Sequence, residues 1–166
     1  MAVKIVPVGL NDYNSNFLHE IIEDYLYQNW SDADIVPRNQ IKFSYKVDQN
    51  VSPTARHAIK CYDGGSFENE SMYNNDTGWK EIHDIDVIIE SRGINNFVND
   101  APIEIFHMKN KIRDIINRDR TALRNVGIHM MTYVDDDRVE QDEQATYIYR
   151  MKVDVRCLQF MERKEA

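Results

Sequence analysis

The sequence predicts a single α+β domain, residues 1–166, with two helices packed on one face of a largely antiparallel or mixed sheet. Two segments, 14–28 and 102–118, repeat apolar residues every three or four positions, which is the spacing of one helix face. Several other segments alternate apolar and polar residues, which is typical of strands with one buried face. Most connections between these strands resemble hairpins, so we expect both helices to cover the same face of the sheet.

The composition is that of a globular protein with one core. The chain has 166 residues, of which 42% are hydrophobic and 29% charged, and this excludes wholesale disorder. A formal net charge of −8 disfavours a general nucleic-acid-binding role, because phosphate contacts need a basic face. Residues 1–100 hold 16 acidic and 8 basic residues, whereas residues 101–166 hold 12 of each, so the whole acidic surplus lies in the first part.

The amino-terminal segment and the two cysteines indicate an intracellular protein. The segment 1–11 is only mildly apolar and is too short for a signal-peptide core or a membrane span, and we expect it to form an edge strand or an extended arm. Cys61 and Cys157 lie far apart and neither belongs to a CxxC pair. We expect two buried free thiols, with a single disulfide between them as the alternative.

The first part of the chain is expected to contain one helix followed by three strands. The helix covers 14–28. The strands cover 41–47, 57–62 and 79–91, and each alternates apolar with polar residues. Between the last two strands lies the sequence DGGSFENESMYNNDTG, 63–78, whose glycines and polar residues predict a long loop.

The second helix carries clear signals at its amino end. Asp100 is a good capping residue, Pro102 is suited to the first turn, and Glu104 favours the positive end of a helix. Basic residues gather late in the helix, where the dipole favours them, so we expect it to end at about Arg118 or Arg124.

A long hairpin is expected to close the domain. A strand at 126–134 leads into an acidic loop, 135–143, and the final strand covers 145–160. Fourteen or so residues at roughly 3.3 Å per residue span about 45 Å, whereas ordinary strands have about 3–10 residues. Such a strand should overhang its own domain, bend at a bulge, or pair with another subunit.

One group of ionisable residues raises the possibility of catalysis. Asp84, Asp86 and Glu90 would share one face of the strand 79–91, and carboxylates on a strand hold magnesium in restriction-type nucleases. However, Arg92 stands where the general-base lysine would be expected. The main interpretation is therefore a solvated strand face, and a small metal-dependent nuclease of restriction-type fold remains the alternative.

Other signals of catalysis or cofactor binding are missing from the sequence. The acidic loop 135–143 lacks the spacing of an EF-hand, and the histidines lack a zinc-ligand spacing. Serine nucleophile elbows, P-loops and GxGxxG turns are absent. We therefore predict no catalytic residue, no cofactor, no metal and no enzymatic activity. A monomeric adaptor that binds through 63–78 stays open as a further possibility.

The distribution of charge suggests an interface between subunits. Residues 104–124 hold six basic and three acidic residues, whereas 135–143 hold six acidic residues and one arginine. Ordinary solubility patterning explains this; alternatively, the acidic hairpin of one subunit contacts the basic helix of the next and closes a ring. The candidate interface residues are Lys109, Lys111, Arg113, Arg118, Arg120, Asp135, Asp136, Asp137, Glu140, Asp142 and Glu143.

The layout resembles the tail terminator (tail completion) proteins of tailed phages and archaeal tailed viruses. The resemblance lies in the order of elements and in the patterning of 85–90, 102–117 and 149–160, and it covers most of 14–160. It implies a six-membered ring in the tail or neck of a virion, made in the host cytoplasm. Such a ring caps the tail tube, meets the head-side connector and lets genome DNA pass through its lumen, where acidic residues would keep phosphates from binding.

Overall fold

The structure, a computed structural model, describes residues 5–7, 18–46, 49–71, 78–93, 100–124, 128–141 and 146–161. It confirms the α+β fold, with two α-helices and a mixed sheet. The helices are α1 (Leu18–Gln28) and α2 (Ala101–Arg118), and a short 3-10 helix, η2 (Arg38–Gln40), precedes the second strand. The strands are β1 (Ile5–Pro7), β2 (Ile41–Phe43), β3 (His57–Ser71), β4 (Gly78–Arg92), β5 (Ile128–Gln141) and β6 (Thr146–Met161).

The sheet is built around the long antiparallel pair β4 and β6. Its order is β1-β6-β4-β3-β2, and β5 also pairs with β6. Because β4 occupies one side of β6, both β1 and β5 lie along the other side, β1 at the carboxyl-terminal end and β5 along the rest. Among the described strands β2 and β3 form the one parallel pair. The outermost long strands are therefore β3 and β5, on opposite sides of the sheet.

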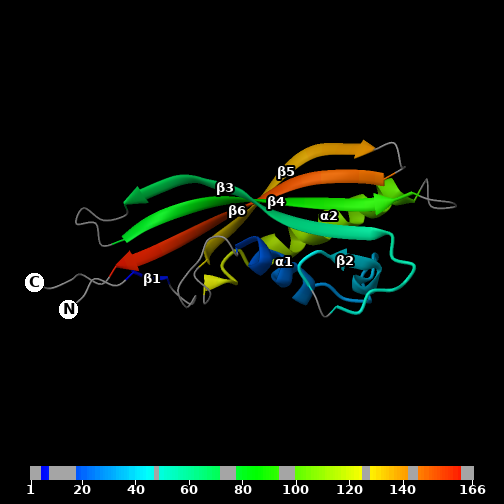
Figure 1. Cartoon of the computed structure of the whole chain (residues 1–166), viewed down its shortest axis with the longest axis horizontal. Coiled ribbons are helices and arrows are strands. Elements are labelled where there is room, and N and C mark those ends of the chain that lie inside the picture. The colour runs from blue at the N-terminus through cyan, green and yellow to red at the C-terminus, as the bar shows by residue number, and fades with distance from the viewer. Residues whose placement is uncertain are drawn as a thin grey trace, which may run out of the picture.

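Both helices pack on the same face of the sheet, as the sequence predicts (Figure 1). The alternation along β4 and β6 turns every second side chain toward the helices and buries it, for example Val87 on β4 and Val153 on β6. From the helices, apolar residues at 3–4 spacing, such as Ile22 and Ile112, complete the core. The other face of the sheet carries the alternate polar residues, and we call it the outer face.

The sheet extends well beyond the helices. The strands β3, β4 and β6 have 15, 15 and 16 residues, and such strands span about 50 Å at roughly 3.3 Å per residue. By contrast, the 18 residues of α2 span about 27 Å at 1.5 Å per residue. Figure 1 shows α1, α2 and β2 under one half of the sheet, while β3, β4 and β6 continue past them. The expected overhang of the last strand is confirmed.

The long loop predicted at 63–78 is largely wrong. In the structure β3 continues to Ser71 and β4 begins at Gly78, so paired strands occupy most of this segment. The glycines mark irregular pairing instead of a turn, because the register of β3 against β4 shifts between Asp63 and Glu68. A Cβ on Gly64 would lie 3.0 Å from the carbonyl oxygen of Asp84, which explains a glycine at this close approach.

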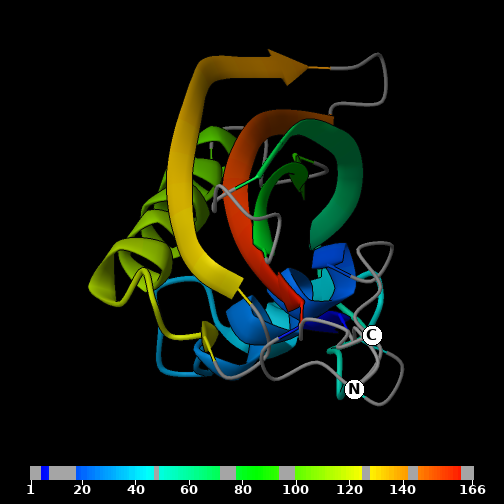
Figure 2. The ribbon, with the colours of Figure 1, turned by 90° about the vertical axis from the view of Figure 1, so that its left-hand side faces the viewer.

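The acidic loop predicted at 135–143 is also mostly strand. The strand β5 runs from Ile128 to Gln141, past the expected end at residue 134. Its register against β6 shifts between Asp135 and Val139, where β5 has two more residues than its partner. Figure 2 shows the sharp bend in β5, drawn from yellow to orange. Among the described strands β5 pairs with β6 alone, so β5 is an edge strand, where acidic residues are common.

The other predicted boundaries are close to the observed ones. The first helix is confirmed from Leu18 to Gln28, whereas its expected start lies outside the described residues. The strand expected at 41–47 is shorter, because the chain turns after Phe43. The second helix ends at Arg118, and its first turn is closed by the Glu104 amide, which donates to the backbone oxygen of Asp100 over 2.9 Å; the Asp100 side chain makes no capping bond.

The two cysteines do not form a disulfide with each other. Cys61 is buried and free, and burial raises the pKa of its thiol well above the ordinary value. It lies opposite Val87 of β4, whereas the backbone of Cys157 lies opposite Glu81. Six residues along a strand correspond to about 20 Å, far beyond the reach of a disulfide. A buried free thiol is therefore confirmed for Cys61.

Candidate functional site

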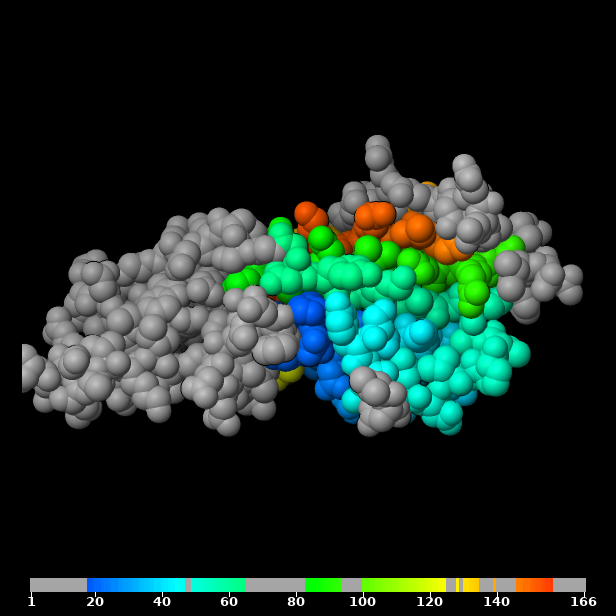
Figure 3. All heavy atoms as spheres, viewed as in Figure 1, coloured from blue at the N-terminus to red at the C-terminus, as the bar shows by residue number. Residues whose placement is uncertain are grey.

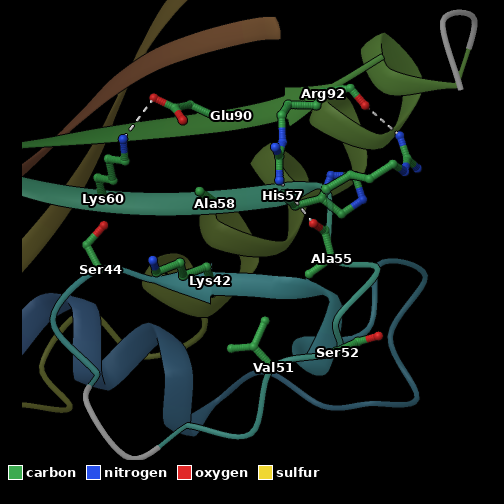
Figure 4. A pocket seen from close by; sticks show the side chains of 11 residues that line it. Lys42, Ser44, Val51, Ser52, Ala55, His57, Ala58, Lys60, Glu90 and Arg92 are labelled. Atoms are coloured by element: carbon green, nitrogen blue, oxygen red, sulfur yellow. Dashed lines mark hydrogen bonds and ion pairs between the residues drawn. The ribbon is translucent and has the colours of Figure 1, made fainter. Parts of the chain in front are cut away.

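A groove rich in basic residues lies on the outer face, where β2, β3 and β4 meet (Figure 4). Its volume is about 600 Å³, and we call it the basic groove. The segment that connects β2 to β3 forms one wall, and the end of β4 forms the other. The residues that line it are Lys42, Ser44, Val51, Ser52, Ala55, Arg56, His57, Ala58, Lys60, Glu90 and Arg92.

The alternation of the strands places the cations in the basic groove. On β2, Ile41 and Phe43 are buried in the core, so Lys42 between them faces outward. On β3, Ile59 is buried, and Lys60 next to it projects from the outer face. The parallel pairing of β2 with β3 then brings these two lysines onto the same part of the sheet.

The charge of the basic groove is opposite to that of the chain as a whole. Four cations line it, from Lys42, Arg56, Lys60 and Arg92, against the single carboxylate of Glu90. Lys60 forms an ion pair with Glu90, at 3.2 Å between Nζ and Oε1. In a chain with a net charge of −8, this arrangement is suited to carboxylates or phosphates of a partner.

A charged clamp fixes one end of the basic groove and joins β3 to the first turn of α2. The Glu104 carboxylate accepts from Arg56 Nη2 over 2.6 Å and contacts His57 Nε2 over 2.5 Å. Arg56 also donates from Nη1 to the backbone oxygen of Arg92 over 2.8 Å. Burial lowers the pKa of His57, so a neutral imidazole can donate its Nε2 hydrogen to Glu104. We assign this clamp a structural role.

Two of the lysines predicted to contact a neighbouring subunit instead contact residues of their own chain. Lys111 Nζ lies 3.0 Å from a carboxylate oxygen of Asp34, in the segment after α1. Lys109 lies over the ring of Tyr149, at 5.1 Å from its centroid. Their side chains are thus engaged in holding α2 to the rest of the domain. Arg113, Arg118 and Arg120, the arginines of the predicted interface, remain exposed.

The acidic half of the predicted interface is only partly described. The backbone of Asp135, Asp136, Asp137 and Glu140 belongs to β5. Their side chains lie outside the described residues, as do Asp142 and Glu143 entirely. The contact of acidic hairpin with basic helix therefore stays a prediction.

The carboxylates of the nuclease alternative share the outer face but do not converge. Asp84 and Glu90 are separated by six residues of one strand, which corresponds to about 20 Å. Metal ligands lie at about 2.0–2.6 Å from the same ion, and Glu90 is already paired with Lys60. Among the described residues, no group of three or more His, Cys, Asp or Glu side chains could hold a metal ion.

A different pair of carboxylates meets across two strands. Asp84 on β4 lies directly opposite Asp154 on β6. Burial raises the pKa of Asp154 to about 6, and the hydrogen bond and negative charge of Asp84 act in the same direction. Lys152 lies 3.9 Å from Asp84 and offsets part of this repulsion. This pair depends on the strand register and cannot be recognised in the sequence alone.

The basic groove could not be predicted from the sequence either. Lys42, Lys60 and Arg92 come from three segments, and the only signal was that each stands at a polar position of an alternating strand. Which strands are neighbours, and that β2 is parallel to β3, follow from the tertiary structure alone.

Comparison with protein-family models finds none that matches the chain, and comparison with curated proteins finds no significant match. Among the described residues, no helix is long and apolar enough to cross a membrane.

Proposed function

We propose that this chain is a structural virion protein, a tail terminator or neck component whose subunits form a ring on the end of the tail tube. The observation that carries the proposal is the shape of the sheet, which overhangs its helices and has open edges on two opposite sides. A domain built in this way is suited to joining copies of itself through its strands.

The two open edges belong to β3 and β5. Beyond Ile59, β3 pairs with β4 alone in the part of the chain that the structure describes, because β2 ends opposite this residue. On the other side, β5 pairs with β6 alone among the described strands. Figure 3 shows the coloured part of β3, residues 57–64, at the surface of the molecule. Two different edges favour a head-to-tail contact, which repeats from copy to copy and gives a closed ring when the rotation between copies fits.

The ring would act by position and not by catalysis. One of its faces would bind the tail-tube protein and stop the tube from growing, and the other would bind the head-side connector. Genome DNA would pass through the lumen, and the acidic surplus of the chain would weaken its adhesion. The role needs no cofactor, no metal and no membrane, and a six-membered ring is what the resemblance implies.

Light scattering coupled to size-exclusion chromatography tests the proposed assembly. The purified chain alone is expected to give a mass near six times its 19.6 kDa, or to form a ring only when a tail-tube protein is added. A strict monomer under both conditions that neither binds nor caps tubes would rule the proposal out. Nuclease assays with magnesium and manganese on linear, nicked and branched DNA provide the contrast, with no cleavage expected.

A further inference from the structure

We infer that neighbouring copies join by adding the β5 edge of one to the β3 edge of the next, with the acidic segment 135–141 of β5 lying at the neighbour's basic groove. This inference rests on the proposed ring and names its interface. It differs from the contact predicted from the sequence, because the acidic segment contacts the basic groove of the neighbouring copy and not its helix α2.

The strand directions permit one continuous sheet. Along the sheet β3, β4, β6 and β5 alternate in direction, since each neighbouring pair is antiparallel. A rotation about a ring axis that sets the β5 of one copy beside the β3 of the next therefore makes this pair antiparallel too. Every contact in the ring would then be of the same kind, without a reversal of any subunit.

Exposed apolar residues at the two edges suggest the register. Val134 on β5 is 38% exposed and Tyr62 on β3 is 41% exposed, and both are among the few large apolar side chains left in solvent. Val134 lies opposite Lys152 and Tyr62 opposite Asp86, which are themselves paired, so both project from the outer face. Placing them opposite each other across the interface would bury both as a cross-strand pair.

This register also pairs opposite charges. Two residues further along each strand, Asp136 of one copy comes opposite Lys60 of the next, because antiparallel strands run in opposite directions. Lys60 is the first residue of the open β3 edge, and beyond it β2 blocks further pairing. The register shift of β5 between Asp135 and Val139 falls at this same point. The bend would direct the rest of β5 away from β3 and toward the basic groove.

The segment 135–141 and the basic groove carry opposite charge. The segment has four acidic residues and one arginine, and the groove has four cations and one carboxylate. Cations are engaged within the chain on both candidate surfaces, Arg56 and Lys60 in the groove and Lys111 on α2, so the register of the two edges selects the groove and charge alone does not. A local contact of opposite charges offsets part of the repulsion between two chains of net charge −8.

Disulfide cross-linking tests the register. The double variant Val134→Cys/Tyr62→Cys is expected to form a ladder of linked chains ending at the ring, whereas each single variant gives no ladder. Val134→Cys combined with Asp86→Cys is the matched control, because Asp86 projects from the same face but lies on the central strand β4, two strands from Val134 and beyond the reach of a disulfide. No ladder from the first pair in assembled rings would overturn the inference.

Charge reversal tests whether the acidic segment contacts the basic groove of the neighbouring copy. Lys60→Glu is expected to weaken assembly at least tenfold at low salt, and Asp136→Lys in the same chain is expected to restore part of it. Arg150→Glu makes the same change of charge on the central strand β6, opposite Ile88, and should leave assembly unchanged. If reversal of Arg113, Arg118 and Arg120 prevents assembly while Lys60→Glu does not, the acceptor is α2 and the inference is wrong.

The two proposals fail in different ways. If rings cap tubes, but no ladder forms and Lys60→Glu does not weaken assembly, the proposed β5–β3 interface is wrong and the terminator function is not contradicted. A wild-type chain that stays monomeric with and without tail-tube protein would contradict the function itself, and circular dichroism of each variant shows whether the fold is retained.

Discussion

At the scale of single residues, a buried glutamate is the clearest departure from ordinary chemistry. Glu23 on α1 is 1% exposed and lies beneath the turn after β2. The Tyr45 amide donates to its Oε2 over 2.5 Å. Burial nevertheless raises its pKa to about 7, because the loss of water outweighs the backbone hydrogen bonds. The helix pattern alone would have placed this residue at a polar position of α1.

The raised pKa of Glu23 predicts a loss of stability as the pH rises. The native protein holds this proton more tightly than the unfolded chain, so the favourable contribution is complete below pH 4.5 and is lost as the pH passes through about 7. The expected loss is on the order of 2–3 kcal/mol. Glu23→Gln should remove this dependence and stabilise the protein at pH 8.

Urea unfolding at pH 5, 6, 7 and 8 measures this effect. Glu20→Gln is the matched control, because Glu20 is exposed on the same helix. It should retain most of the pH dependence, since the charge of Glu20 is the smallest of the influences that raise the pKa of Glu23. If Glu23→Gln follows the wild-type profile as well, the carboxyl is not protonated in the native protein.

At the scale of elements, the periodic patterns predicted both helices and most strands, and they failed where charge and glycine override the pattern. The apolar positions of β4 and β6 alternate without interruption, so their existence was clear. Gly64 indicated a loop but serves a close approach between paired strands. Asp135 indicated a hairpin tip but lies in a strand with an open edge. Local polarity does not distinguish a turn from an irregular edge strand.

The clamp around Glu104 is expected to matter more than a similar pair on the outer face. Glu104→Gln weakens two contacts of a partly buried carboxylate, with Arg56 and His57, and should lower the free energy of unfolding by about 1–3 kcal/mol. Glu90→Gln removes the more exposed pair with Lys60 and should cost less than about 1 kcal/mol. Chemical denaturation of both variants compares them directly; equal losses would argue against the clamp.

At the scale of the whole molecule, the candidate site shows what a sequence cannot reveal. The basic groove and the Asp84–Asp154 pair each join residues from different strands. Such sites depend on strand order and register, which no single segment specifies. A run of like charges within one segment, in contrast, can be read directly from the sequence. For that reason the acidic segment 135–143 was predictable, and the basic residues of α2 were the partner that the sequence suggested.

The assembled molecule should respond to salt through this acidic segment. Replacing Asp135, Asp136 and Asp137 by asparagine is expected to weaken assembly at low ionic strength, because the attraction to the neighbouring copy is reduced. At about 1 M salt the wild type and the variant should converge, since charges are then screened beyond about 3 Å. Analytical ultracentrifugation at both ionic strengths measures the difference. Unchanged assembly at low salt would show that the acidic segment does not contribute to the contact between copies.

The central claim is that the chain ends the growth of a tail tube. The most direct measurement follows polymerisation of the tail-tube protein by electron microscopy, with and without this chain at a small fraction of the tube subunits. The account predicts shorter tubes whose mean length falls as the chain is added, with a ring of extra density at one end. Tubes of unchanged length and bare ends at every ratio would contradict it.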